Sequence, residues 1–305
     1  MRWRKQGMVY GPDGRSEWAR HTALQPTPLL TPDGRFRVFV GMRDERGVSR
    51  VGFVDVDAAN PSRVLRVSGR PALDVGTPGA FDENGVVPCA VVERDGRLYL
   101  YYAGYQLGRK VRFYVFGGLA VSDDGGETFR RHARVPVCDR TDRELLFRVI
   151  HSIMREGGRW RVWYGGGSEF TTERGYQLPN YNIRYTESAD GFSLPEDYAV
   201  CVDTGGEDEY RVGRPYVIRH GGLYKMFYSA GTKSRGYRLA YAESEDGVRW
   251  ERRDAHVGID VSESGWDSEM QAYPSVVAYG DRVYLFYNGN DYGREGFGYA
   301  VLERW

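Results

Sequence analysis

Acidic residues stand just ahead of several short apolar segments in this chain. The segment that contains Pro274 is preceded by Asp267 and Glu269, and the segment that contains Pro88 is preceded by Asp82. Two carboxylates that face one ligand can carry out glycosyl transfer, because one protonates the leaving oxygen while the other acts as nucleophile or activates water. We therefore predict a catalytic set of carboxylates, with solvated loop residues as the alternative. Its members are Asp82, Glu144, Asp267 and Glu269.

Polar residues that could orient a ligand lie in or beside the same segments. Arginines such as Arg148, Arg211 and Arg214 favour a carboxylate or phosphate on the ligand, although an ion pair with a neighbouring carboxylate is the alternative for each. His21 and His151 leave a divalent metal open, but the sequence has no HxH or HExxH motif and we expect no cofactor. The predicted substrate-binding residues are His21, Arg43, Asp44, Glu83, Tyr105, Arg148, His151, Arg214, Asn288 and Asn290.

The segments that must position these residues form an internal repeat. Equivalent positions are 62, 63, 64 and 59 residues apart, and they are Pro26, Pro88, His151, Pro215 and Pro274. In each repeat an alternating apolar segment leads through a turn rich in Gly and Asp into a second and then a third segment of the same kind. This order is typical of antiparallel hairpins and not of helices.

The repeat predicts an all-β fold, namely a single-domain five-bladed β-propeller over residues 1–305 with three or four antiparallel strands in each blade. The N-terminal segment would add an outer strand to the last blade and so cover exposed edges. An open sandwich or a two-domain β protein is the alternative. Inner strands are expected near residues 24–31, 86–93, 149–155, 213–219 and 272–278.

A pocket is expected at one end of the propeller axis. The starts of the inner strands and the ends of the second strands meet there in such a fold, so that five elements converge on one concave place. The predicted catalytic and binding residues lie just before or within inner strands, or at the ends of second strands. We therefore expect them around a bound sugar or glycosylated metabolite, with an anionic group on that ligand as an open alternative.

Composition excludes some classes of partner. The chain has 305 residues, with 42 Lys plus Arg and 42 Asp plus Glu, and this balance gives no argument for binding nucleic acid or a membrane surface. Its first residues lack the apolar run of a signal peptide, and no stretch is apolar enough for a membrane span, so we expect a cytoplasmic protein. Cys89, Cys138 and Cys201 are too scattered for a disulfide framework or a cysteine-rich zinc site. The oligomeric state stays open.

Three turns share one sequence pattern. They are SDDGGETF at 122–129, SEDGVRW at 244–250 and the shorter SADGF at 188–192, and we expect them to be structural. With the five repeats and segments such as FDENGVVP, YLYYAGY and YNGNDYG, they resemble the arabinanase, levansucrase and invertase superfamily of five-bladed, glycosidase-like propellers. The resemblance extends over about residues 18–303. Within that superfamily it is to small members encoded with polysaccharide or natural-product pathways.

The resemblance implies a hydrolase-like activity on a carbohydrate. It places Asp82 at the acid of the second blade and Glu144 at that of the third, but His21 stands where the first blade should carry an Asp. Asp267 or Glu269 would have to replace that residue. The W-x-N-D-P-N-G and R-D-P motifs of the invertase branch are absent.

Three functions are compatible with these observations. The leading hypothesis is a glycoside hydrolase-like enzyme that acts through paired carboxylates. The second is a non-hydrolytic biosynthetic enzyme that uses the same fold for cyclisation, elimination or group transfer, as His21 suggests. The third is a non-catalytic carbohydrate-binding propeller. The sequence leaves the substrate, the stereochemical outcome and the pathway open.

Overall fold

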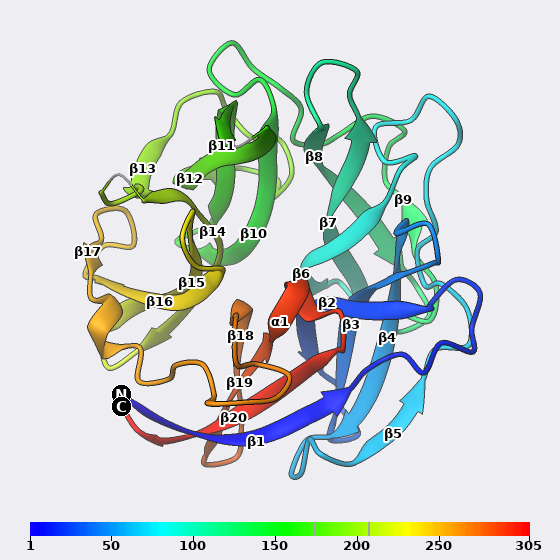
Figure 1. The fold of residues 1–305 in the computed structure, drawn as a ribbon, viewed down its shortest axis with the longest axis vertical. Helices are drawn as coiled ribbons and strands as arrows, with labels where there is room; N and C mark the ends of the chain where they lie inside the picture. Colours follow the sequence, from blue (N-terminus) through cyan, green and yellow to red (C-terminus); the bar gives the residue numbers. More distant parts are fainter. Residues whose placement is uncertain (174, 207) are drawn as a thin grey trace.

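The computed structural model describes residues 1–173, 175–206 and 208–305, and these residues form strands β1 to β20 with almost no helix. The strands are arranged around a central axis, and the predicted all-β propeller fold is confirmed (Figure 1). The five strands nearest the axis are β2 (His21–Leu30), β6 (Val86–Arg94), β10 (Phe147–Glu156), β14 (Glu209–His220) and β18 (Ala272–Tyr279). Each begins a unit of four antiparallel strands.

The other strands of each unit follow outwards from the axis. The second strands are β3 (Arg35–Arg43), β7 (Arg97–Leu107), β11 (Arg159–Glu173), β15 (Leu223–Thr232) and β19 (Arg282–Asn288). The third strands are β4 (Ser49–Asp57), β8 (Phe113–Ser122), β12 (Tyr176–Ser188), β16 (Tyr237–Ser244) and β20 (Phe297–Arg304). The outer strands are β5 (Val64–Val67), β9 (Arg130–Arg131), β13 (Ala199–Val202), β17 (Glu251–Arg252) and β1 (Arg2–Tyr10).

Short turns join the first and second strands, as the Gly- and Asp-rich sequences predict. Between β6 and β7, Asp95 and Gly96 have φ values of 52° and 73°. A two-residue type I′ turn needs positive φ at both central residues, because only this twist matches that of the flanking strands. Such turns fix the register and hence which side chains face the axis.

The N-terminal strand closes the ring. β1 pairs antiparallel with β20, so that the last unit has the order β1-β20-β19-β18 and contains both ends of the chain (Figure 1). On β1 the Trp3 side chain is 7% exposed, and its indole Nε1 donates a hydrogen bond of 3.0 Å to the carbonyl of Val257. The Trp3 ring also packs edge-on against Phe227, at 6.0 Å between centroids, which ties the last unit to the preceding one.

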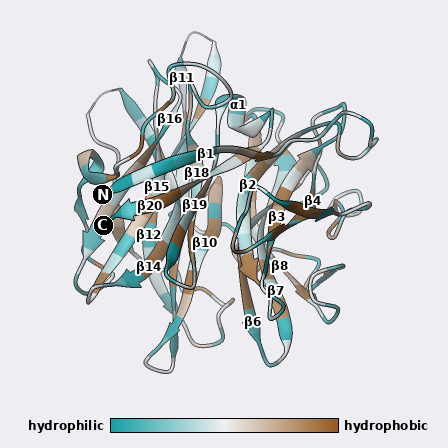
Figure 2. Ribbon diagram, turned by 90° about the horizontal axis from the view of Figure 1, so that it is seen from below, coloured by the Kyte–Doolittle hydropathy of each residue, from teal (hydrophilic) through white to brown (hydrophobic). Residues whose placement is uncertain are grey.

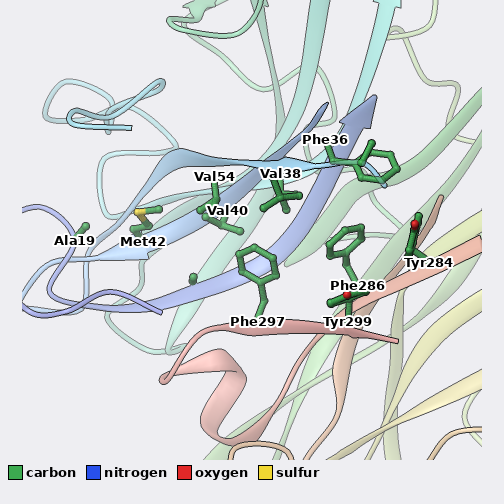
Figure 3. Packing of buried hydrophobic residues seen from close by; sticks show 13 residues of the cluster. Ala19, Phe36, Val38, Val40, Met42, Val54, Tyr284, Phe286, Phe297 and Tyr299 are labelled. Carbon is green, nitrogen blue, oxygen red and sulfur yellow. The ribbon is translucent and has the colours of Figure 1, made fainter. Parts of the chain in front are cut away.

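Aromatic and aliphatic side chains fill the space between neighbouring units. Between the first and last units, Phe36 packs edge-on against Tyr284 and Phe286, at centroid distances of 5.8 and 5.9 Å (Figure 3). Such edge-to-face pairs add to the stabilisation from buried apolar area. Figure 2 shows that hydrophobic stretches follow the strands, while the connecting loops are mostly neutral or hydrophilic. The aromatic segments of the repeat are therefore core.

The three patterned turns have the structural role that the sequence predicts. In the first, the Ser122 hydroxyl donates to Asp124 at 2.6 Å and accepts from the Gly126 amide at 2.8 Å, while the buried Phe129 packs beneath the turn against Phe39. The turns at Ser188 and Ser244 repeat the Ser–Asp and Ser–Gly hydrogen bonds.

Helical structure is minimal. The 3-10 helix η1 (Asp254–His256) and the helical turn α1 (Asn290–Gly293) are each a few residues long. Among the described residues, no helix has the length and apolar character needed to cross a membrane.

Truncation of Trp3 should destabilise the closed ring. We expect Trp3→Ala to lower the free energy of unfolding by about 3–5 kcal/mol, since a buried Trp side chain and its hydrogen bond are lost. Met8→Ala on the same strand is the control, because Met8 is 47% exposed and should change stability by less than about 0.5 kcal/mol. Urea unfolding measures both, and equal effects of the two substitutions would contradict closure through Trp3.

Candidate functional site

All five inner strands are irregular at the same level along the axis. Each contains a register shift against its second strand, between Leu24 and Thr27, Pro88 and Ala90, Ile150 and Ser152, Gly213 and Tyr216, and Ala272 and Ser275. Such β-bulges bend a strand and redirect a side chain. We call the first unpaired residues of these five bulges the axial ring; they are Gln25, Cys89, His151, Arg214 and Tyr273.

Four residues of the axial ring line a pocket with a volume of about 300 Å³. This volume is at the lower end of the range of pockets that hold small molecules. The walls come from inner strands, from second-strand ends such as Tyr105 on β7, and from third strands such as Tyr181 on β12. Aromatic side chains dominate the lining, namely Tyr105, Phe113, Phe147, Tyr181, Tyr237, Tyr273 and Tyr292.

The charge of the pocket is strongly positive. Among its described lining residues Asp291 is the single carboxylate, and this residue is exposed at the rim. The Arg211 guanidinium lies 4.1 Å from the ring centroid of Tyr237, and its Nη2 donates a hydrogen bond of 3.0 Å to the Tyr292 hydroxyl. The lining arginines are Arg43, Arg112, Arg211 and Arg214.

Several buried nitrogen atoms of the pocket have no hydrogen-bond partner within the described structure. They are Nε of Arg43, Nε of Arg211, Nε and Nη1 of Arg214, and Nδ1 of His151. Buried polar groups are nearly always hydrogen-bonded, and a buried cation without a partner is costly. A bound anion would accept hydrogen bonds from the arginine nitrogens, and this makes the pocket the strongest candidate for a ligand site.

Backbone strain concentrates at the same place. Of the seven described non-glycine residues with positive φ, five line the pocket, namely Gln25, Arg214, Tyr273, Asp291 and Tyr292. Each such conformation costs on the order of 1–3 kcal/mol and persists only where the surroundings enforce it. Asn288 enforces the conformation of Gln25. Its Oδ1 accepts a hydrogen bond of 2.7 Å from the Gln25 amide, and its Nδ2 donates to the carbonyls of Ala23 and Gly296.

Burial keeps the histidine of the axial ring uncharged. It lowers the pKa of His151 well below 6.5, and the nearby Arg214 guanidinium lowers it further. Burial also raises the pKa of Tyr105 to about 12. At neutral pH the fixed charges of the pocket are therefore those of its arginines and of Asp291.

The structure brings together only some of the predicted site residues. Arg43, Tyr105, His151 and Arg214 line the axial pocket. Of the other predicted binding residues, Arg148 pairs with Glu144, Asp44 pairs with Arg50, and Glu83 accepts the Gly79 amide. Their binding roles stay predictions.

The remaining predicted binding residues lie outside the described lining of the pocket. His21 Nδ1 lies 2.7 Å from the Thr22 hydroxyl, and Asn288 holds the bulge of the first inner strand as described above. Asn290 accepts the backbone amides of Glu269 and Met270 at 2.8 and 3.0 Å. These residues shape the site from behind its lining.

The predicted catalytic carboxylates do not converge on the pocket. Asp82 has no exposed area and accepts hydrogen bonds from the Tyr102 hydroxyl at 2.9 Å and from Arg131 Nε at 2.8 Å. Asp267 is 2% exposed and is bound by the Tyr287 hydroxyl at 3.0 Å and by Lys5 Nζ at 2.8 Å. Both carboxylates lie outside the described lining of the axial pocket.

The same arrangement recurs in two further units. Glu144 is fully buried between Arg148 and Arg184, at 2.8 and 2.9 Å. In the fourth unit, Tyr228 donates to Asp254 at 2.6 Å and Arg252 pairs with Glu209 at 2.8 Å. We call these four groups the carboxylate clusters. Membership of these clusters gives Asp82, Glu144 and Asp267 a structural role. A catalytic role for these three residues, and for the exposed Glu269, stays a prediction.

Several lining residues are absent from the predicted set. Gln25, Tyr181, Tyr237, Tyr273 and Tyr292 all face the pocket. A signal for Gln25 and Tyr273 is present in the sequence, because both immediately precede the proline of a repeat, as Arg214 does. Tyr181 and Tyr237 follow no such pattern, since third strands reach the pocket only through the twist of the sheets.

A second hollow of about 420 Å³ lies beside the axial pocket and shares Tyr181 with it. Its polar groups bind one another, as Asn182 does with Asp203 at 3.1 Å and Asn180 with Thr171 at 2.8 Å. None of its described lining residues has a buried polar atom without a partner. No group of three or more His, Cys, Asp and Glu side chains suited to a metal ion occurs in the described ranges.

Loss of a carboxylate cluster should destabilise the fold. We expect Asp82→Asn to lower the free energy of unfolding by on the order of 3 kcal/mol, because Arg131 loses its buried partner. Asp123→Asn removes an exposed partner of Arg97 and should cost less than about 1 kcal/mol. Chemical unfolding of the two variants provides the comparison, and an unchanged stability of Asp82→Asn would contradict the structural role.

The Asp267 cluster should make stability sensitive to acid. Burial alone raises the pKa of Asp267, but Lys5, Ser262 and Gln271 outweigh burial and hold the pKa below 3.8. A lowered pKa stabilises the folded state above about pH 4, and this stabilisation is lost as the pH falls through the folded value. The difference in unfolding free energy between wild type and Asp267→Asn should therefore shrink from pH 7 to pH 3. A constant difference would refute the linkage.

Solved structures similar to this chain are β-propellers of glycoside hydrolases. The complex of BT0996 with RGII is 18% identical, with coverage of 99% of this chain and 92% of the other and a TM-score of 0.76. A thermostable family-43 glycoside hydrolase is 18% identical over 94% and 90% of the two chains, with a TM-score of 0.70. A structure from the GH130 family of mannoside phosphorylases, which contains glycoside hydrolases that target β-1,2 mannosidic linkages in Candida mannan, is 14% identical over 98% and 93% of the two chains, with a TM-score of 0.74.

Closer similarity is found to mycobacterial sequences. No protein-family model matches the chain. Protein Rv1502 of Mycobacterium tuberculosis strain H37Rv is 36% identical over 306 aligned residues, which cover 99% of this chain and 100% of the relative. Protein MT1551 of strain CDC 1551 matches with the same identity and coverage. The chain therefore belongs to one family with Rv1502, and its fold is that of the glycosidase-like β-propellers.

Proposed function

We propose that the axial pocket binds an anionic sugar or glycosylated metabolite. The observation that carries this proposal is the set of buried arginine donors without partners in an aromatic-lined cavity. Guanidinium groups form strong charge-assisted hydrogen bonds with carboxylate, sulfate and phosphate oxygens. A ligand with such a group would satisfy Nε of Arg211 and Nε and Nη1 of Arg214, which make no hydrogen bond within the described structure.

The walls of the pocket suit a sugar ring. Tyrosine offers an apolar face for packing and a hydroxyl for hydrogen bonds, and Tyr105, Tyr181, Tyr237, Tyr273 and Tyr292 surround the cavity. The volume of about 300 Å³ accommodates one such ring with its substituents. The glycoside hydrolases among the structural neighbours support a sugar as the ligand class.

Hydrolysis by a carboxylate pair is less well supported. That mechanism places two carboxylates about 5–5.5 Å or 6.5–9.5 Å apart across the scissile bond. The described lining of the pocket offers Asp291 alone, while Asp82, Glu144 and Asp267 are held in the carboxylate clusters. The proposal is therefore recognition of the anionic sugar, with a non-hydrolytic reaction or binding alone ranked above hydrolysis.

The proposal is tested by the ligand that the protein retains. Cell extract and a panel of acidic and neutral saccharides are incubated with the protein, and the retained and altered compounds are identified by mass spectrometry. We expect acidic members to be retained. Gain of one water on a compound, lost in an Asp82→Asn variant that is shown to be folded under the assay conditions, would restore the hydrolase hypothesis. Preference for neutral members would contradict the proposal.

Removal of one pocket arginine should weaken this binding. Arg211→Met should raise the Kd of the retained acidic compound by roughly 10- to 100-fold, because a hydrogen bond to a charged group is lost. Arg249→Met is the control, since the Arg249 side chain is 93% exposed and is absent from the pocket lining. Isothermal titration calorimetry gives both constants, and an unchanged Kd in Arg211→Met would argue against the assigned site.

A further inference from the structure

His151 is the member of the axial ring whose chemistry the proposed anion site does not yet use. The residue occupies the bulge of β10, lines the pocket and keeps part of its surface accessible. Its Nδ1 is buried without a hydrogen-bond partner within the described structure, and its Nε2 lies beside Gly165, a lining residue of β11. The adjacent Ser152 hydroxyl accepts the Val217 amide of β14 at 3.1 Å, which holds the bulged strands β10 and β14 side by side.

Few side chains of the pocket can accept a proton at neutral pH. Guanidinium and phenol groups hold their protons there, and burial raises the pKa of Tyr105 to about 12 and that of Tyr273 well above 10. Among the described lining residues, the two proton acceptors are His151 and Asp291. Asp291 is exposed at the rim, whereas His151 lies in the axial ring close to Arg214. An acceptor is thus placed next to the groups that would hold an anion.

The arginines would make a carboxylate ligand reactive toward this acceptor. Removal of a hydrogen from the carbon next to a carboxylate is difficult in water, because the new negative charge adds to the existing one. Guanidinium groups that bind the carboxylate offset this charge as it develops, and Arg211 and Arg214 have unpaired buried nitrogens for the purpose. The carboxylate in turn offsets the Arg214 charge that helps to lower the pKa of His151, so that the histidine becomes a stronger base in the complex.

We propose that His151 transfers a proton from and to C5 of a bound uronic acid, the carbon that carries the carboxylate. The inference rests on the proposed function and adds to it a reaction and the residue that performs it. One ring nitrogen of His151 takes the C5 proton, and the electron pair of the C–H bond moves into the carboxylate to form an enediolate. Return of the proton restores the sugar.

The same intermediate leads to elimination when O4 of the uronic acid carries a second sugar. The enediolate electron pair then forms the C4=C5 double bond, the C4–O4 bond breaks, and the departing oxygen takes the proton from His151. The products are an unsaturated uronic acid and a free sugar hydroxyl. No water, oxidant or other co-reactant is consumed, and no second carboxylate is needed.

Hydrogen exchange at C5 tests this proton transfer in the unmodified protein. The probes are the methyl glycosides of glucuronate, galacturonate and mannuronate, together with digalacturonate, each incubated with the protein in D2O after its binding has been measured by calorimetry. We expect a probe that binds to lose its C5–H signal in the proton NMR spectrum, or, for digalacturonate, to give an unsaturated product that absorbs in the ultraviolet. Either result supports the inference. A probe that binds and shows neither reaction above the rate without protein would overturn it.

The variant His151→Gln separates proton transfer from binding, because an amide forms hydrogen bonds but does not accept a proton at neutral pH. The rate of reaction at C5 should fall at least about 100-fold, as for the loss of a general base. The Kd should change by less than about tenfold, since one neutral hydrogen bond is at stake. His256→Gln is the control and should leave both unchanged, because His256 is exposed and absent from the pocket lining. Thermal unfolding verifies that both variants are folded.

Asp291→Asn tests the other proton acceptor of the lining. Asn tolerates the φ of 46° at this position, so the loop should keep its conformation. A reaction that is lost in Asp291→Asn but kept in His151→Gln would assign the base to Asp291 and overturn the inference. Binding of the uronates without reaction at C5 would leave the proposed function intact, whereas failure of every acidic probe to bind would count against both.

Discussion

A carboxylate that is removed from water needs a cation and hydrogen-bond donors close by, and this requirement organises the propeller around its axis. In the second unit, Asp82 lies in the segment that enters the inner strand β6, Tyr102 lies on the second strand β7, and Arg131 lies on the outer strand β9. One buried group thus ties three layers of the unit together. Asp267 does the same in the last unit with Tyr287 on β19 and Lys5 on β1.

The acids of the carboxylate clusters bind partners within the sheets and do not line the axial pocket, whereas four arginines do. The inner strands bulge at one level, and the bulges present Gln25, His151, Arg214 and Tyr273 to the pocket. The result is a glycosidase-like scaffold in which the central cavity carries arginines where paired-carboxylate chemistry would need acids. A fold does not fix a function, and the chemistry of this cavity has to be argued from its own residues.

The repeat in the sequence predicted the fold because spacing and turns are local properties. Pro26, Pro88, His151, Pro215 and Pro274 lie in the five inner strands of the structure, and the N-terminal segment closes the last unit. The direction in which a side chain points is not a local property, because it depends on the register between strands. A shift of one residue moves a side chain to the other face of a strand. The repeat prolines lie at or beside four of the five bulges, but they do not say which side chain the bulge turns toward the axis.

The same reasoning explains which site residues could be foreseen. Arg43, Tyr105, His151 and Arg214 follow directly from their positions in the repeat, and they line the pocket. Asp82 has an equally suitable position, but its partner Arg131 is 49 residues away in a two-residue strand that the pattern does not predict. Without that partner, a buried ion pair and a catalytic acid look the same in sequence.

The pairing of β1 with β20 also determines when the last unit can form during synthesis. Arg2–Tyr10 is synthesised well before its partner strand Phe297–Arg304, so β1 has no strand to pair with until β20 has been made. The first four units consist of strands from continuous stretches of chain and can form as they emerge. The nascent protein therefore passes through an open ring whose two unpaired ends become one unit only after β20 has been made.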